Sequence, residues 1–172
     1  MKSETQGSPM SRKPYVLFMC THNAARSQIA EALLQKYAGH RFEVASAGFE
    51  PTEVHPLTRQ LLSDVGIDPS DLVAKALRDF PSKVAVRHAI IVCERTEEHC
   101  PRVFPFTGQT LYWAFEDPAK SQGPPELQLA TFRRVRDEID ARIPGVASRT
   151  PDRDRHAVAR ASERINRHED QF

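Results

Sequence analysis

The amino-acid sequence predicts an α/β protein with a doubly wound, mainly parallel four-stranded sheet flanked by helices. Short apolar runs typical of strands lie at residues 15–19, 41–48, 88–93 and 110–115. Segments with helical periodicity follow the first, second and fourth of these runs. Strands that alternate with helices favour a parallel sheet, because each helix carries the chain back to the edge where the next strand begins.

The first helix is predicted directly after the first strand, in the segment SQIAEALLQKYAG (27–39). Apolar residues recur there at the spacing of one helix face, and Gly39 ends the pattern. The residues of this face are Ile29, Ala30, Leu33, Leu34 and Tyr37.

Two further helices are predicted at residues 55–66 and 125–143. In the shorter one, Pro56 suits a first turn and Gly66 suits the position after the last turn. The longer one has a single apolar stripe, which consists of Leu129, Phe132, Val135, Ile139 and Ile143.

The chain divides into three parts. We expect residues 1–13 to be disordered, residues 14–145 to form one folded domain, and residues 146–172 to form a C-terminal extension that is helical or partly disordered. A chain of 172 residues is long enough for one well-buried core.

Composition and charge exclude several classes of protein. The formal net charge is +1, so the chain lacks the strong positive field of a nucleic-acid binder. No apolar run is long enough to span a bilayer, and the polar start of the sequence does not resemble a signal peptide. We therefore expect a cytoplasmic, monomeric protein without a nucleic-acid or membrane partner.

The three cysteines, Cys20, Cys93 and Cys100, are the residues most open to chemistry. Their odd number argues against a disulfide scaffold, and their spacing lacks the paired pattern of a zinc site. Catalytic or redox use and inert burial both remain open. Cys20 and Cys93 each lie at the carboxyl end of a predicted strand, where α/β proteins bind their ligands, and this placement favours catalytic use.

The octet CTHNAARS (20–27) has the form of an oxyanion site. A loop of this length can wrap around a tetrahedral anion so that successive backbone N–H groups point to its oxygens. Arg26 can add a bidentate contact, and the following helix adds its positive end. The same field, with a hydrogen bond from Ser27, is expected to lower the pKa of Cys20. The residues expected to bind the oxyanion are Thr21, His22, Asn23, Ala24, Ala25, Arg26 and Ser27.

Two of these loop residues have alternative explanations. Asn23 can pin the loop through side-chain hydrogen bonds, or it can be an ordinary turn residue. His22 can be a minor polar contact for the anion, or a surface histidine.

The segment VLFMCTHNAARSQIAEALL (16–34) resembles the nucleophile loop of the low-molecular-weight protein tyrosine phosphatase superfamily, and within it the thioredoxin-coupled arsenate reductases. The similarity covers roughly residues 14–143. It continues in four further segments: SAG (46–48), CERTEEHCP (93–101), YWAFEDPAK (112–120) and FRRVRDEI (132–139).

This resemblance implies a catalytic set of five residues: Cys20, Arg26, Cys93, Cys100 and Asp117. Cys20 would attack arsenate, and Asp117 would protonate the departing oxygen. Cys93 would then form a disulfide with Cys20, and Cys100 would move that disulfide to Cys93–Cys100, which thioredoxin would reduce. We expect Cys100 to lie exposed in a charged loop, where a reductant can reach the disulfide.

Two alternatives remain open. The chain could be a low-molecular-weight protein tyrosine phosphatase that acts through a Cys20 phosphocysteine, or a sensor that binds an oxyanion without turnover. Cys100 argues against the phosphatase, which needs only one cysteine, and Asp117 argues against the sensor. Residual phosphatase activity is expected even for the reductase, because arsenate and phosphate are similar tetrahedral anions.

The resemblance also bears on whether the protein binds a metal ion. Some relatives bind potassium beside the loop, and Asn23, Glu31 and Ser46 stand at matching positions. No further carboxylate is matched. We therefore expect no bound metal and no organic cofactor.

Overall fold

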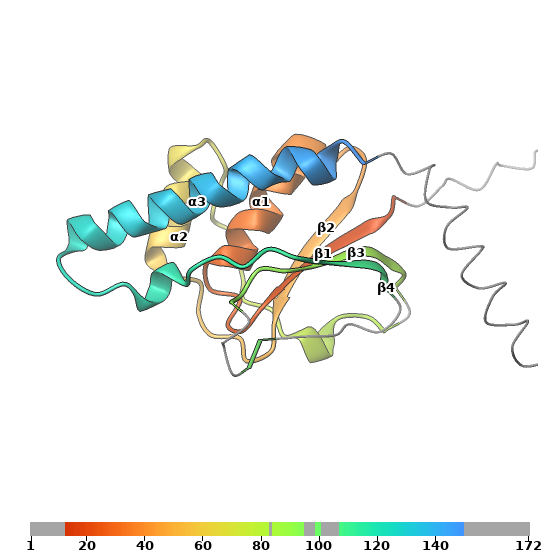
Figure 1. The fold of residues 1–172 in the computed structure, drawn as a ribbon, viewed down its shortest axis with the longest axis horizontal. Coiled ribbons are helices and arrows are strands. Elements are labelled where there is room, and N and C mark those ends of the chain that lie inside the picture. Colours follow the sequence, from red (N-terminus) through yellow and green to blue (C-terminus); the bar gives the residue numbers. More distant parts are fainter. Residues whose placement is uncertain (1–12, 83, 95–98, 101–106, 150–172) are drawn as a thin grey trace, which may run out of the picture.

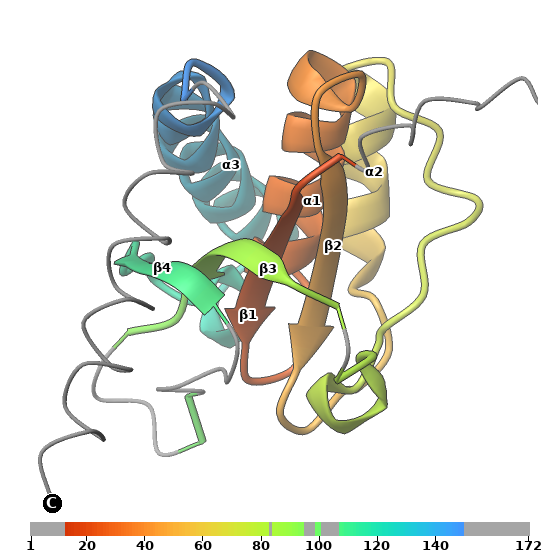
Figure 2. The ribbon, with the colours of Figure 1, turned by 90° about the vertical axis from the view of Figure 1, so that its right-hand side faces the viewer.

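The computed structural model describes residues 13–82, 84–94, 99–100 and 107–149. Its centre is a four-stranded sheet in the order β2-β1-β3-β4, and every neighbouring pair of strands is parallel (Figures 1 and 2). The strands are β1 (Tyr15–Cys20), β2 (Glu43–Gly48), β3 (Val86–Ile91) and β4 (Thr107–Tyr112). The predicted fold class and strand number are confirmed.

Within the described residues, three α-helices accompany the sheet: α1 (Arg26–Ala38), α2 (Pro56–Asp64) and α3 (Pro125–Ala147). Two short 3₁₀ helices, η1 (Leu77–Asp79) and η2 (Pro118–Lys120), complete the described elements. In Figure 1, α1 and α3 lie above the sheet and η1 lies below it. The two long helices pack against each other side by side on one face of the sheet, where α1 contacts β1 and β2 (Figure 2).

The core is built around β1, because a central strand is covered on both faces. Val16, Leu17, Phe18 and Met19 have no exposed surface, which explains the continuous apolar run in the sequence. The stripe predicted on α3 is buried from Phe132 to Ile143, with Leu129 partly buried at its start. On α1 the predicted face is buried except at Tyr37, which is 52% exposed because its amphipathic ring tolerates water.

The boundaries of several elements differ from the predictions, and those of β3, β4 and α3 illustrate the reasons. Strand β3 ends at Ile91, so Cys93 lies two residues beyond it. Strand β4 begins at Thr107, earlier than predicted, because its first half is a polar, exposed sheet edge that hydropathy cannot detect. Helix α3 continues to Ala147 and includes Pro144 in its last turn. The predictions for residues 1–12 and 150–172 lie outside the described residues.

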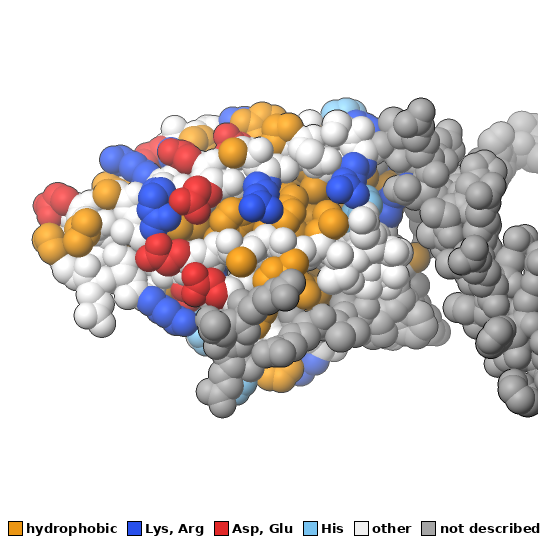
Figure 3. Space-filling view, viewed as in Figure 1, with side chains coloured by type: hydrophobic (Ala, Val, Ile, Leu, Met, Phe, Trp, Pro, Cys, Tyr) orange, Lys and Arg blue, Asp and Glu red, His pale blue; other side chains and the backbone are white. Residues whose placement is uncertain are grey.

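The surface agrees with the balanced composition. Acidic and basic side chains are mixed on the face of α3 in Figure 3, without a patch of one sign. Within the described ranges, none of the helices is both long enough and apolar enough to span a bilayer.

The sheet topology brings two cysteines to one edge. Cys20 is the last residue of β1, and Met19 pairs with Ile91 of β3. The pairing continues past β3, since the Val92 N–H donates to the Met19 carbonyl at 2.9 Å. The chain segments that carry Cys20 and Cys93 therefore leave the sheet side by side, at the carboxyl ends of adjacent parallel strands.

Gly48 provides a test of this packing. It pairs with Cys20, and a Cβ atom at this position would lie 2.8 Å from the Thr21 carbonyl oxygen and 2.9 Å from the Asn23 nitrogen. Because both neighbours are backbone atoms, Gly48→Ala is expected to lower the free energy of unfolding by about 1–3 kcal/mol. Denaturant titration measures this change.

The matched control is Gly145→Ala on α3, where an added Cβ meets no atom within 4 Å. We expect this variant to gain stability, by about 0.5–1 kcal/mol, because alanine favours the helix. Equal stability of the two variants would contradict the close approach of β2 to the loop.

Candidate active site

The loop between β1 and α1 surrounds the Cys20 sulfur. Cys20 is only 2% exposed, and its Sγ accepts a hydrogen bond from the Asn23 N–H at 3.1 Å. The Ser27 Oγ lies 2.8 Å from the same sulfur. When Cys20 is a thiolate it can only accept a hydrogen bond, so the Ser27 hydroxyl then donates to the sulfur.

The outer side of this loop is held by the segment that follows β2. Backbone N–H groups of residues 49–55 donate to four loop carbonyls at 2.8–3.1 Å: Phe49 to Cys20, Glu50 to Thr21, Thr52 to His22 and His55 to Ala24. Since these carbonyls point outward, the amide side of the loop faces inward, toward Cys20. This is the polarity that an oxyanion site requires.

Asn23 ties the loop together from inside. Its φ of 51° is left-handed, a conformation that asparagine tolerates better than most residues. Its side-chain amide nitrogen donates to Ser27 Oγ and Ser46 Oγ at 2.8 and 2.9 Å. Its Oδ1 accepts from the Gln28 side chain and from the Lys75 N–H, each at 2.8 Å. A fully buried amide with four hydrogen bonds rigidifies the loop.

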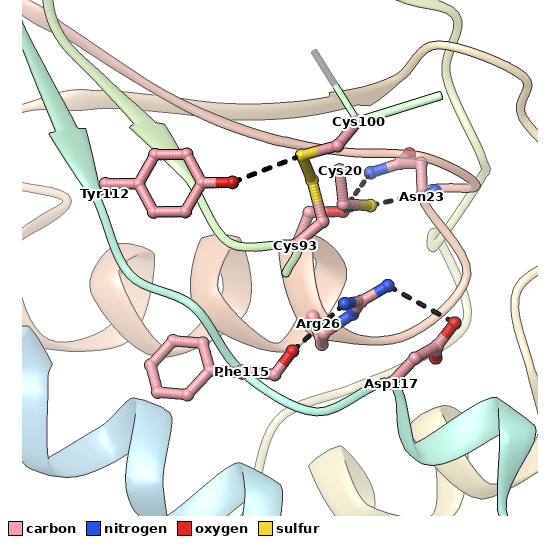
Figure 4. Close-up of a disulfide and its surroundings, with 9 residues drawn as sticks. Cys20, Asn23, Arg26, Cys93, Cys100, Tyr112, Phe115 and Asp117 are labelled. Carbon is pink, nitrogen blue, oxygen red and sulfur yellow. Dashed lines mark hydrogen bonds and ion pairs between the residues drawn. A yellow bond between two sulfur atoms is a disulfide. The ribbon is translucent and has the colours of Figure 1, made fainter. Parts of the chain in front are cut away.

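Arg26 connects this loop to the segment after β4. The guanidinium is 3% exposed; Nη1 donates to the Phe115 carbonyl at 3.1 Å, and Nη2 lies 3.2 Å from Asp117 Oδ2. Asp117 is itself nearly buried and its Oδ1 accepts from the Ala119 N–H, at the start of η2. Cys20, Arg26 and Asp117 therefore come together, as Figure 4 shows.

His22 faces away from this centre. Its Nδ1 lies 3.1 Å from the Glu50 carbonyl oxygen, on the outer side of the loop. That contact favours the explanation of His22 as a histidine that fastens the loop to its surroundings. That the backbone N–H of His22 contacts the anion stays a prediction.

Cys93 and Cys100 form a disulfide, with their Cα atoms 6.1 Å apart. Both are buried: Cys93 has no exposed surface and Cys100 is 6% exposed. The prediction that Cys100 lies exposed is wrong. The charged neighbours suggested a solvated loop, whereas the disulfide draws Cys100 onto the core cluster that also contains Trp113 and Phe115.

The prediction for the pKa of Cys20 is also wrong in direction. Burial of the thiol raises its pKa above the ordinary value. The hydrogen bond from Ser27, the positive charge of Arg26 and the backbone N–H groups of Asn23 and Ser27 oppose this effect without cancelling it. Sequence motifs identify donors and charges, but the extent of desolvation depends on tertiary packing.

The residues matched to a potassium site have a different cation beside them. Lys75 Nζ lies 3.2 Å from Glu31 Oε2, and Ser46 donates a hydrogen bond to the same oxygen. The Lys75 ammonium group thus supplies the positive charge that a potassium ion would bring to Glu31. Glu31 and Ser46 therefore do not fit a potassium ion. Among the described residues, no group of three or more His, Cys, Asp or Glu side chains could hold a metal ion.

His55 is a site residue that the sequence analysis missed. Its Nδ1 accepts from the Leu57 N–H at the start of α2, and its ring stacks on Phe132 at 4.6 Å. Burial lowers the pKa of His55, whereas the negative charge of Asp117 raises it. The only local signal was a histidine before the proline that starts a helix, and the electrostatic effect of Asp117 comes from a segment far along the chain.

The family model for "Low molecular weight phosphotyrosine protein phosphatase" matches residues 15–157, which is most of the chain. The chain belongs to this family. The resemblance of the loop motif is therefore confirmed, and it extends through the strands that support the phosphatase loop.

Curated and solved relatives of this phosphatase-family chain include arsenate reductases. The protein from Halalkalibacterium halodurans named arsenate reductase is 36% identical over 132 residues, covering 76% of this chain and 93% of that protein. A solved thioredoxin-dependent arsenate reductase from Corynebacterium glutamicum is 36% identical with a TM-score of 0.59, and it matches 80% of this chain. This chain covers 61% of that structure's length.

A further solved structure, described as an arsenate reductase in the phosphate binding state, is 26% identical with a TM-score of 0.64. The match covers 78% of this chain and 97% of that chain. The two proteins therefore share the whole phosphatase-type domain.

The Ser27 hydroxyl is the strongest of the groups that lower the pKa of Cys20, so Ser27→Ala is expected to raise this pKa further. At a fixed pH below the pKa, the thiolate fraction should fall about two- to tenfold. Ultraviolet absorbance of the thiolate against pH measures it, in a background where Cys93→Ser and Cys100→Ser leave Cys20 as the single thiol.

Ser63→Ala serves as the control, because Ser63 is exposed on α2. This variant should titrate like the background. A thiolate fraction unaltered by Ser27→Ala would show that the Ser27 hydroxyl does not stabilise the charged sulfur.

Proposed function

We propose that this protein reduces arsenate to arsenite through a cysteine disulfide cascade and is regenerated by thioredoxin. The observation that carries the proposal is the Cys93–Cys100 disulfide, which lies beside the Cys20 loop in Figure 4. A phosphatase needs one nucleophilic cysteine. A second and third cysteine that can bond to each other supply the two electrons that arsenate reduction consumes.

The first step uses the loop, Arg26 and Asp117. The inward amide groups and the guanidinium bind the arsenate oxygens, and the Cys20 thiolate attacks arsenic. Asp117, in its carboxylic acid form, gives its proton to the departing oxygen, which leaves as water, and the resulting carboxylate pairs with Arg26. The product is a thiol–arsenate adduct in which arsenic is still pentavalent.

The second step transfers the electrons. The Cys93 thiolate attacks the Cys20 sulfur, the sulfur–arsenic bond breaks, and its electron pair stays on arsenic, which leaves as trivalent arsenite. A Cys20–Cys93 disulfide remains. Cys20 ends β1 and Cys93 lies two residues beyond the adjacent parallel strand β3, so this bond joins neighbouring segments.

The third step frees the nucleophile. The Cys100 thiolate attacks Cys93, and Cys20 departs as a thiolate that Asn23 and Ser27 stabilise. Thioredoxin then reduces the Cys93–Cys100 disulfide by thiol–disulfide exchange. The name of the Corynebacterium glutamicum relative, a thioredoxin-dependent arsenate reductase, supports this class of reductant.

Phosphate ester cleavage is the second candidate function, favoured by the family match and by the Arg26–Asp117 pair. The same loop and acid can form and hydrolyse a phosphocysteine. The residues after the acid are Pro118, Ala119 and Lys120, which provide no aromatic ring to hold a phosphotyrosine. Phosphatase activity is therefore proposed as a side reaction of the same site.

The cascade requires Cys100 for turnover but not for the first release of arsenite. With arsenate, thioredoxin, thioredoxin reductase and NADPH, the wild-type protein should consume NADPH steadily. Cys100→Ser should release at most one arsenite per protein and then stop. Absorbance of NADPH and a parallel arsenite assay measure both quantities.

The single arsenite released by Cys100→Ser is an internal control, because it shows a folded site that completes the first two steps. Steady turnover by Cys100→Ser at the wild-type rate would refute the cascade. Aryl phosphate cleavage without any arsenate-dependent NADPH consumption by the wild-type protein would favour the phosphatase.

A further inference from the structure

Tyr112 contacts the cysteine pair from the opposite side to Cys20. Its hydroxyl oxygen lies 3.7 Å from Cys100 Sγ, within the range of a hydrogen bond to sulfur (Figure 4). Neither the loop motif nor the proposed cascade assigns this tyrosine a part. The contact is formed by the last residue of β4, whose side chain packs partly buried against the core.

The position of Tyr112 is set by the sheet. Tyr112 pairs with Ile91 of β3, and the next residue, Trp113, donates its N–H to the Ile91 carbonyl at 2.8 Å. Phe115 continues the pairing with a hydrogen bond to Val92, the residue before Cys93. The phenol is therefore held in register with the segment that carries Cys93, and it offers Cys100 a fixed partner.

We propose that Tyr112 is a positioning residue that holds Cys100 against Cys93 and stabilises the Cys100 thiolate by donating a hydrogen bond. A phenol hydroxyl is a donor at neutral pH. A disulfide sulfur accepts only weakly, whereas a thiolate accepts strongly, so the contact stabilises the charged form preferentially. In the disulfide form that the structure shows, Cys100 is 6% exposed, and the Tyr112 hydroxyl lies beside its sulfur.

The proposal deepens the cascade and rests on it for its place in the reaction. In the third step the Cys100 thiolate forms a bond to the Cys93 sulfur while the Cys20–Cys93 bond breaks. The electron pair of the broken bond leaves on Cys20, so the exchange needs no outside oxidant or reductant. Tyr112 keeps its proton throughout and only donates to the sulfur that attacks.

Among the described residues, two other charged groups at this site have partners of their own. The neighbouring His99 ring lies 3.0 Å from the Glu50 carboxylate, and Arg26 pairs with Asp117. A protonated His99 would also favour a nearby thiolate. Tyr112→Phe removes one oxygen and leaves these charges in place, so it isolates the hydroxyl.

The test measures the reactivity of Cys100 directly. In a Cys20→Ser, Cys93→Ser background, Cys100 is the only thiol, and its alkylation by iodoacetamide is followed against pH. Adding Tyr112→Phe should slow alkylation at neutral pH by about three- to tenfold, the effect expected of one hydrogen bond, while the limiting rate at high pH is unchanged. A loss of packing alone would not shift the pH profile in this way.

Tyr37→Phe is the matched control, because Tyr37 is exposed on α1 and should leave the profile unchanged. An alkylation profile identical in the Tyr112→Phe protein and the background would overturn the proposal. This assay contains no arsenate, so it stands even if the native protein fails to reduce arsenate. In that event the shifted profile would support the Tyr112 contact, and only the proposed function would fail.

Discussion

The parallel pairing of β1 between β2 and β3 is the constraint on which the rest of the site depends. It sets Cys20 beside Gly48 on one side and directs the chain toward Cys93 on the other. The absence of a side chain at Gly48 lets the loop backbone close over β2. The segments that carry Cys20 and Cys93 thus leave the sheet side by side because β1 and β3 run in the same direction.

Burial determines how strongly the hydrogen bonds and charges of this site interact. Cys20, Asn23, Arg26 and Asp117 are all nearly inaccessible to water, so each hydrogen bond and charge acts at low dielectric. Burial raises the pKa of Cys20, and the hydrogen-bond donors of the loop lower it only in part. An oxyanion held by the same donors would enter an environment already organised for negative charge, and this organisation is what the proposed chemistry uses.

Local patterns predicted the parts of the site that are local in the chain. The Cys20–Arg26 spacing and the following helix are short-range features, and the strands follow from apolar runs except for the polar first half of β4. Lys75 and His55 come from distant segments, so no motif could assign them to the site. The burial of Cys100 and the raised pKa of Cys20 depend on packing density, which charge pattern around a cysteine does not reveal.

The central claim is that electrons leave through Cys93 and Cys100 and that Cys20 is restored. The most direct measurement is disulfide mapping by mass spectrometry after the fully reduced protein meets one equivalent of arsenate without any reductant. The account predicts a Cys93–Cys100 disulfide, an unmodified Cys20 thiol and one arsenite per protein. Three reduced cysteines with arsenate unconsumed, or a stable end product that still contains Cys20 in a disulfide, would contradict it.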